Sequence, residues 1–101
     1  MTVNEQAEKS FGEFVEYHLA NPTTYWGIVE YKDAHKLDYM EGWFEGYSAR
    51  LAVGYDPTIT DDDMWTEGEY RAYRGGQWEE IRGKYFAAGF TGGYKQLKET
   101  I

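Results

Sequence analysis

Two stretches of this chain repeat one pattern, Tyr39-Met-Glu-Gly42-Trp43-Phe-Glu-Gly46-Tyr47 and Phe86-Ala-Ala-Gly89-Phe90-Thr-Gly-Gly93-Tyr94. Both follow the pattern aromatic-x-x-Gly-aromatic-x-x-Gly-Tyr, at a constant offset of 47 residues. The matching positions are i, i+3, i+4, i+7 and i+8, which lie on one side of an α-helix. The repeat therefore predicts two helices that each carry a face of glycine and aromatic residues.

The glycines of the repeat predict that these two helices pack closely. A glycine inside a helix costs about 1 kcal/mol relative to alanine, so four cost about 4 kcal/mol. Because a small domain has only about 5–15 kcal/mol of net stability, close backbone approach is the simplest way to offset this cost. We expect a large ring of one helix to lie on the bare backbone of the other. The residues expected to pack are Gly42, Trp43, Gly46, Tyr47, Gly89, Phe90, Gly93 and Tyr94.

Length and composition predict a single all-α domain spanning residues 1–101. The helices expected from apolar periodicity and capping residues are 3–19, about 24–53, 60–74 and about 77–98. The stretch 24–31 is rich in β-branched and aromatic residues and also suits a strand; helix is preferred because the chain has no clear second strand. The sequence thus predicts a small bundle of about four helices, two of them long and glycine-faced.

The third expected helix begins with an acidic turn. Thr60 is a helix-capping residue, and three aspartates follow it in the first turn, where carboxylates favour the positive end of the helix dipole. The helix dipole thus gives the three aspartates a structural role, and no binding or catalytic function is needed to explain them. The side chains expected on the buried side of this helix are Met64, Trp65, Gly68, Ala72 and Tyr73.

Charge is the second feature of the sequence. The net charge is −8, and residues 1–69 hold 15 acids against 4 bases. The stretch from Asp56 to Glu69 has six acids and no base. This charge argues against direct binding of nucleic acid, whose phosphates require lysine and arginine. It favours a basic protein partner, although it is also a common means of staying soluble.

No residue pattern indicates a catalytic, metal or cofactor site. The chain has no cysteine, so it has no disulfide and no thiolate ligand, as is typical of a reducing compartment. Asp61-Asp-Asp63 lacks the alternation and glycine of a calcium loop, and the two histidines, His18 and His35, form no Glu-x-x-His motif. We expect no signal peptide, because residues 1–6 hold no basic residue and no apolar run, and no membrane span. We therefore expect a non-enzymatic, cytoplasmic protein without metal or cofactor.

Acidic and aromatic residues alternate along the third helix, and this points to protein binding. Tryptophan and tyrosine are favoured anchors at interfaces, and surrounding carboxylates give steering towards a basic partner. The residues expected to bind the partner are Asp61, Asp62, Asp63, Trp65, Glu67, Glu69, Tyr70 and Tyr73. The alternative is a homodimer or larger homo-oligomer, in which the glycine-aromatic faces meet between chains.

In general character the chain resembles small phage-encoded accessory proteins of the anti-defence and host-takeover type, such as anti-CRISPR inhibitors. The resemblance lies in a short cysteine-free chain, the acidic surface from Asp56 to Glu69 and many tyrosines and tryptophans. It implies a stoichiometric inhibitor that occupies the nucleic-acid-binding surface of a basic protein, as a nucleic-acid mimic. The repeat at 42–47 and 89–94 is also similar to short helical segments of ribosome modulation factor, but that family is strongly basic.

Overall fold

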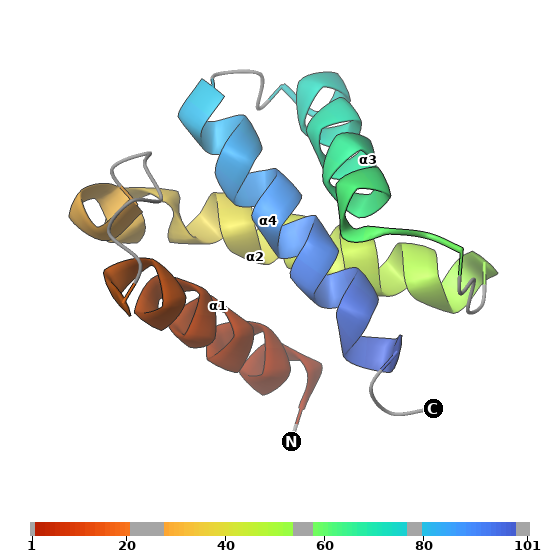
Figure 1. Cartoon of the computed structure of the whole chain (residues 1–101), viewed down its shortest axis with the longest axis horizontal. Coiled ribbons are helices and arrows are strands. Elements are labelled where there is room, and N and C mark those ends of the chain that lie inside the picture. The colour runs from red at the N-terminus through yellow and green to blue at the C-terminus, as the bar shows by residue number, and fades with distance from the viewer. Residues whose placement is uncertain (1, 21–27, 54–57, 77–79, 99–101) are drawn as a thin grey trace.

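The computed structural model describes residues 2–20, 28–53, 58–76 and 80–98, and four helices account for nearly all of them (Figure 1). They are α1 (Val3–Ala20), α2 (Ile28–Val53), α3 (Asp61–Arg74) and α4 (Glu80–Lys98). These ranges contain no strand, which confirms the all-α prediction. The preference for helix at 24–31 is confirmed from Ile28 onward, and positions 24–27 lie outside the described residues. None of the four helices is long and apolar enough to cross a membrane.

The helices begin where side chains can satisfy their free amide groups. At α1, the Thr2 amide donates to Glu5 Oε1 at 3.3 Å, and the Glu5 amide donates to Thr2 Oγ1 at 3.1 Å. This reciprocal pair is the capping box that the Thr2–Glu5 spacing indicates. Inward from it, Ala7, Phe11, Val15 and His18 are buried and Phe14 is half-buried, as the apolar period of α1 predicts.

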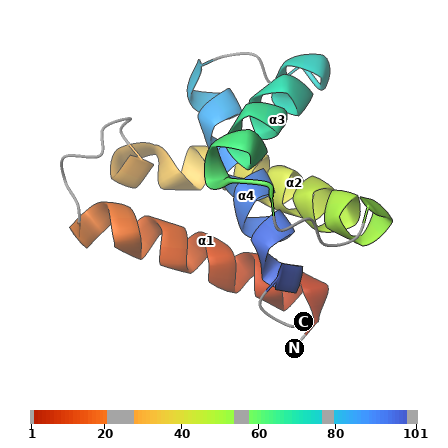
Figure 2. The same cartoon turned by 45° about the vertical axis from the view of Figure 1, so that its right-hand side comes forward.

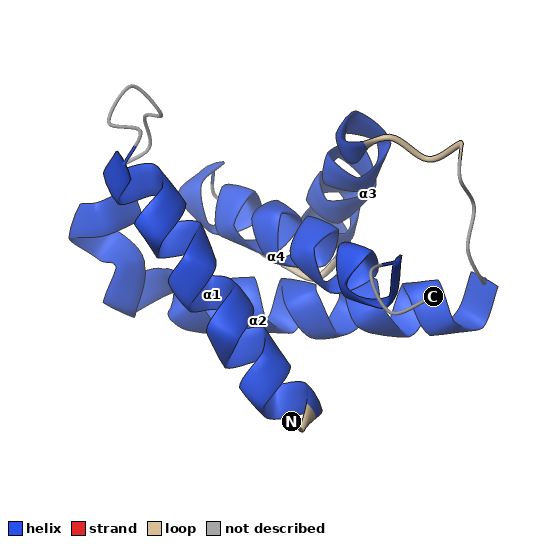
Figure 3. Cartoon of the chain, turned by 60° about the horizontal axis from the view of Figure 1, so that its bottom comes forward, coloured by secondary structure: helices blue, strands red, loops and turns tan. Residues whose placement is uncertain are grey.

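Helix α4 is the central element of the bundle. It crosses α2, with which it makes the most extensive contact in the fold, and α1 and α3 lie on either side of it (Figures 1 and 2). Turned so that its bottom comes forward, the molecule shows α1 in front of α2 and α4, with α3 behind (Figure 3). The residues of the repeat therefore lie at the centre of the fold, between α2 and α4.

Each glycine of the repeat contacts the backbone of the opposite helix. A Cβ added to Gly42 would lie 2.8 Å from the carbonyl carbon of Phe86, and one added to Gly46 would lie 2.8 Å from that of Phe90, with the oxygens closer still. The contacts move in the same direction along both helices, from Gly42 and Phe86 to Gly46 and Phe90. Helices α2 and α4 therefore run parallel where they cross. The predicted close packing of two glycine-faced helices is confirmed.

The contact is reciprocal between the two copies of the repeat. A Cβ on Gly89 would meet the carbonyl group of Tyr39, and one on Gly93 would meet that of Trp43. The expectation that a ring lies on the bare backbone is wrong at these glycines, since the group that approaches is a backbone carbonyl. The hydrogen that stands in place of Cβ points at an oxygen, which is the arrangement of a Cα–H···O contact.

The rings of the repeat stack within their own helices instead. Trp43 and Tyr47 have centroids 5.2 Å apart at an interplanar angle of 14°, and Phe90 and Tyr94 have centroids 6.3 Å apart at 27°. Trp43, Tyr85, Phe86 and Phe90 are the largest fully buried side chains in the described part of the chain. The equivalence of the two copies thus extends from the glycines to the aromatic pairs.

Most side chains predicted to face inward do so, with one clear exception. Met64, Gly68 and Ala72 of α3 are buried, and Trp65 is half-buried. The prediction that Tyr73 is buried is wrong, because its side chain is 73% exposed. Gly68 brings α3 so close to α4 that a Cβ there would lie 2.8 Å from Ala87 Cα. A helix held this closely buries only a narrow stripe, and Tyr73 lies beyond its edge.

On α4, apolar periodicity predicts that Trp78, Ile81, Tyr85, Ala88, Gly89 and Gly92 face inward. Tyr85, Ala88 and Gly89 are buried, whereas Ile81 and Gly92 are only half-buried. Trp78, the remaining residue of that prediction, lies outside the described residues.

Candidate protein-binding surface on α3

Helix α3 begins with a complete capping box. Thr60 is extended, with φ −92° and ψ 167°; its Oγ1 accepts from the Asp63 amide at 3.1 Å, and its own amide donates to Asp63 Oδ2 at 3.1 Å. This arrangement satisfies amide groups that would otherwise be free at the first turn. Thr60 is therefore confirmed as the cap, and Asp63 is engaged in holding the start of the helix.

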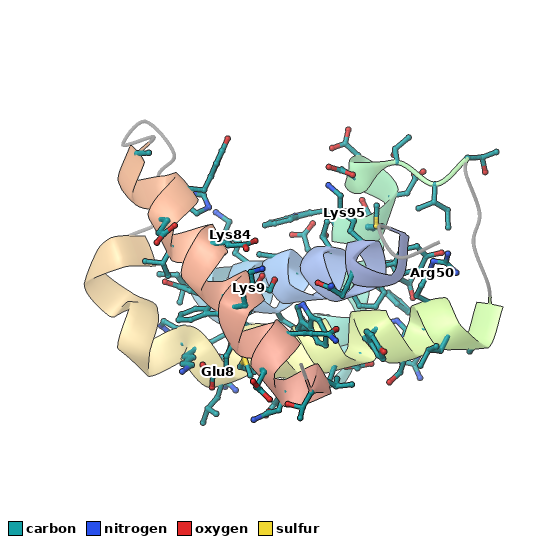
Figure 4. All side chains as sticks on the ribbon, turned by 90° about the horizontal axis from the view of Figure 1, so that it is seen from below. Glu8, Lys9, Arg50, Lys84 and Lys95 are labelled. Carbon is teal, nitrogen blue, oxygen red and sulfur yellow. The ribbon has the colours of Figure 1, made fainter. Side chains whose placement is uncertain are left out.

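Two more of the acids expected to bind a partner pair with cations of the chain itself. Asp61 Oδ2 lies 2.8 Å from Lys95 Nζ of α4, and Figure 4 shows Lys95 near the beginning of α3. Glu67 Oε1 lies 2.9 Å from Arg71 Nε, and Arg71 also reaches Glu45 Oε1 of α2 at 3.2 Å. These pairs are part-exposed and so contribute at most about 1 kcal/mol each. They do, however, reduce the negative field that α3 presents.

Two acids and two tyrosines remain turned to solvent. Asp62 and Glu69 are exposed and make no ion pair with any described residue. Tyr70 is 56% exposed and Tyr73 is 73% exposed. Since these positions lie on the side of α3 opposite Met64, Gly68 and Ala72, they share its outer face. We call Asp62, Glu69, Tyr70 and Tyr73 the α3 outer surface.

The structure separates Trp65 from the other predicted anchors. Its ring is half-buried and packs against the core cluster that contains Trp43 and Tyr85. Its principal contacts are thus within the fold. Hydrophobic periodicity places position 65 at the edge of the buried stripe, where the neighbouring helix decides how much of the ring is covered.

Sequence reasoning missed a cation beside the tyrosines. The Arg74 guanidinium lies 5.6 Å from the centroid of the Tyr70 ring, within the range of a cation–π contact. Their spacing, i and i+4 on one helix, was the available signal. Arg74 therefore places a positive charge beside the α3 outer surface, whose own charged residues, Asp62 and Glu69, are acidic.

A second exposed feature, on α2, was also missed. Leu37, Phe44 and Leu51 are 74%, 37% and 62% exposed. They stand seven residues apart, so they lie along one side of the helix. The heptad spacing is present in the sequence, where it overlaps the glycine-aromatic repeat on another side of the same helix.

Titratable groups elsewhere form structural contacts. Asp38, which is buried, accepts from Arg82 Nη2 at 3.2 Å and lies 3.2 Å from His35 Nδ1. The Ser10 and Tyr39 hydroxyls are 2.6 Å apart, and burial raises the pKa of Tyr39 to about 12, so the pair is protonated at neutral pH. Among the described residues, no group of three or more acidic or histidine side chains could hold a metal ion.

A polar groove of about 280 Å³ lies between α1 and α4. Its walls carry Lys9 and Lys95, both labelled in Figure 4, and Glu13. Lys95 is bonded to Asp61 and Lys9 lies 4.0 Å from Glu13, so each cation of the groove already faces a carboxylate. The groove therefore offers a ligand little uncompensated charge.

Comparison of the chain with protein-family models, with curated proteins and with solved structures found no match. Its function must therefore be argued from the exposed surfaces themselves.

Proposed function

We propose that this protein is a non-enzymatic binding protein that inhibits or modulates a basic, nucleic-acid-binding protein. In this proposal the α3 outer surface occupies the basic surface of the partner. The observation that carries it is the exposure of Tyr70 and Tyr73, neighbours on one helix, beside the exposed acids Asp62 and Glu69.

Paired exposed tyrosines favour binding for an energetic reason. Tyrosine can bury a large ring at an interface and still hydrogen-bond through its hydroxyl, at a low cost in side-chain entropy. In α3 both rings are more than half exposed, so burial in the core does not account for two aromatic residues at these positions. Aromatic side chains of this kind are enriched among the residues that dominate binding energy.

Charge sets the expected partner. The chain carries a net charge of −8, which repels nucleic acid and accelerates association with positively charged surfaces. Pairing of Asp61 with Lys95 and of Glu67 with Arg71 leaves Asp62 and Glu69 as the acids best placed to face a partner's lysines or arginines. Rim charges of this type affect association rate and salt dependence more than they affect final affinity.

The alternative, a homo-oligomer assembled through the glycine-aromatic faces, has less support. Those faces contact each other within one chain, at Gly42, Gly46, Gly89 and Gly93. A second copy could use them only if α2 or α4 were exchanged between chains.

The proposal is tested by capture from a lysate of the source organism, with bound proteins quantified by mass spectrometry. Wild type is compared with Tyr70→Ala/Tyr73→Ala and with Asp62→Lys/Glu69→Lys. A charge-matched control, Glu13→Lys/Glu16→Lys, places the same change on exposed positions of α1.

We expect the wild type and the control to capture basic proteins. Each α3 variant should capture at least about tenfold less of these proteins than the wild type does. Retention by the wild type should also weaken as salt rises. Equal recovery by the α3 variants, or captured proteins without a basic surface, would overturn the proposal.

A further inference from the structure

One carboxylate in the first turn of α3 is paired with a cation of α4. We call Asp61, Asp62 and Asp63 the acidic turn. Lys95 Nζ, in the last turn of α4, lies 2.8 Å from Asp61 Oδ2, and Figure 4 shows Lys95 near the beginning of α3. Asp62, the next residue along the chain, is exposed and makes no ion pair with any described residue. Of these two neighbouring carboxylates, the chain itself neutralises only one.

The Asp61–Lys95 pair is one that another cation can replace at little cost. The Asp61 side chain is 66% exposed and that of Lys95 is 38% exposed, so water and ions compete for both groups. In the described part of the chain, Asp61 is the sole ion-pair partner of Lys95. Its release breaks one exposed contact and restores rotamer freedom to a long side chain.

Arg71, the other cation that pairs with an acid of α3, is held by more contacts. It bonds Glu67 at 2.9 Å and Glu45 at 3.2 Å, and its guanidinium lies 5.1 Å from the centroid of the Phe90 ring. These contacts join Arg71 to α2 and α4 as well as to its own helix. Displacement of Arg71 would break all of them together, whereas displacement of Lys95 breaks one. Lys95 is therefore the cation that a partner can exchange.

The fold does not depend on Lys95 to hold α3 in place. Helix α3 packs closely on α4 at Gly68, and the Thr60–Asp63 capping box fixes its first turn. A displaced Lys95 also has another carboxylate nearby, because Glu13 lines the same polar groove between α1 and α4. Lys95 can thus leave Asp61 without loss of the contacts that position the start of α3.

We propose that Lys95 is an exchangeable counter-ion of the acidic turn, and that a lysine or arginine of the bound partner replaces it at Asp61. This inference rests on the function proposed for the α3 outer surface. The ammonium group 2.8 Å from Asp61 shows which chemistry this carboxylate accepts. A partner cation drawn to Asp62 arrives one residue away from it. Because Lys95 must be displaced, a surface that presents two cations gains more than a surface that presents one, which favours strongly basic partners.

The test measures the binding of fluorescein-labelled octalysine to the full chain by fluorescence anisotropy, at low salt where exposed charges are least screened. Lys95→Met frees Asp61 and should tighten binding by about twofold to fivefold, the range expected for an exposed ion pair. In an Asp61→Asn background, the gain from Lys95→Met should be at least about twofold smaller. Both steps remove one positive charge, so this double-mutant cycle cancels the effect of net charge.

Two controls separate the exchange from other causes. Lys36 is also 38% exposed, and it pairs with Glu8 of α1 at 2.6 Å rather than with an acid of α3. Lys36→Met should therefore give the same gain in the wild-type background as in the Asp61→Asn background. Far-UV circular dichroism of Lys95→Met should match that of the wild type, because an exposed ion pair contributes little to stability.

The outcomes distinguish this inference from the function proposed for α3. Suppose that Asp62→Lys/Glu69→Lys weakens octalysine binding but that Lys95→Met gives equal gains in the two backgrounds. That result would overturn the exchange at Asp61 and leave the proposed function standing. Octalysine binding that Asp62→Lys/Glu69→Lys does not weaken would overturn both, since cations would then bind elsewhere on the chain. The absence of binding up to about 1 mM, the weak limit of specific affinity, would also overturn both.

Discussion

Replacing Gly46 with alanine tests the α2–α4 interface most directly. In an exposed helix this change stabilises by about 1 kcal/mol, because alanine is the better helix former. Here the added Cβ would lie 2.8 Å from the carbonyl carbon and 3.0 Å from the Cα of Phe90. Both are backbone atoms inside a helix, so neither can turn aside as the end of a flexible side chain could.

The size of the effect follows from the overlap. Carbon atoms are in favourable contact at about 3.5–4.0 Å, and the Phe90 carbonyl oxygen lies closer still to the added Cβ. The two helices must therefore separate by about 1 Å, which forfeits about half of the dispersion energy across the gap. Overpacking of this type costs about 3 kcal/mol at the upper end of its usual range. After the gain of about 1 kcal/mol in helix propensity, the net destabilisation is about 2 kcal/mol. The melting temperature should fall by about 8–16 °C.

Gly12→Ala is the matched control. Gly12 lies within α1, and an added Cβ would meet no atom within 4 Å. The same substitution should therefore raise the unfolding free energy by about 1 kcal/mol. Both variants are measured by thermal and urea unfolding, monitored by far-UV circular dichroism.

A double-mutant cycle sharpens the test. Gly89→Ala places a Cβ against the Tyr39 carbonyl in the same interface. Once α2 and α4 have separated to make room for one methyl group, a second methyl group in the same interface destabilises the fold less. Gly46→Ala/Gly89→Ala should therefore be less destabilising than the sum of the two single substitutions. The reasoning is refuted if Gly46→Ala is as stable as Gly12→Ala.

Three further predictions concern single side chains. The buried Tyr94 hydroxyl has no hydrogen-bond partner in the described part of the chain, so Tyr94→Phe should raise the unfolding free energy by about 1 kcal/mol. A lower unfolding free energy for this variant, measured by chemical denaturation, would contradict the prediction. Burial lowers the pKa of His18, so protons favour the unfolded chain. Stability should decline as pH falls below about 6.5, and this decline should be smaller in His18→Gln when unfolding is measured across that range. Thr60→Ala removes the cap of α3 and should cost about 1 kcal/mol, whereas Thr66→Ala, at an exposed position of the same helix, should not; equal unfolding midpoints for the two variants would count against the cap.

Much of the local structure could be predicted because its causes are local. Thr2 and Thr60 cap their helices through bonds to residues three positions later. The buried stripe of α1 follows from a period that one helix sets for itself. Close packing of the glycine-rich helices follows from the cost of glycine, which requires a compensating contact.

The candidate binding surfaces were less predictable, because exposure depends on what packs nearby. Tyr73 and Trp65 are both aromatic residues of α3, yet one is 73% exposed and the other packs on the core cluster. Asp61 is paired because Lys95 lies near in space, although the two residues are far apart in sequence. No local pattern distinguishes Asp61 from Asp62 in this respect.

The sequence by itself determined that the chain is helical, where helices begin, and that two of them present faces of glycine and aromatic residues. Only the tertiary structure decided that these faces meet in parallel, with each glycine against a carbonyl group of the other copy. It also decided that Leu37, Phe44 and Leu51 face outward. The physical reason is that periodicity defines the faces of a helix, whereas the partner of each face depends on packing summed over the whole fold.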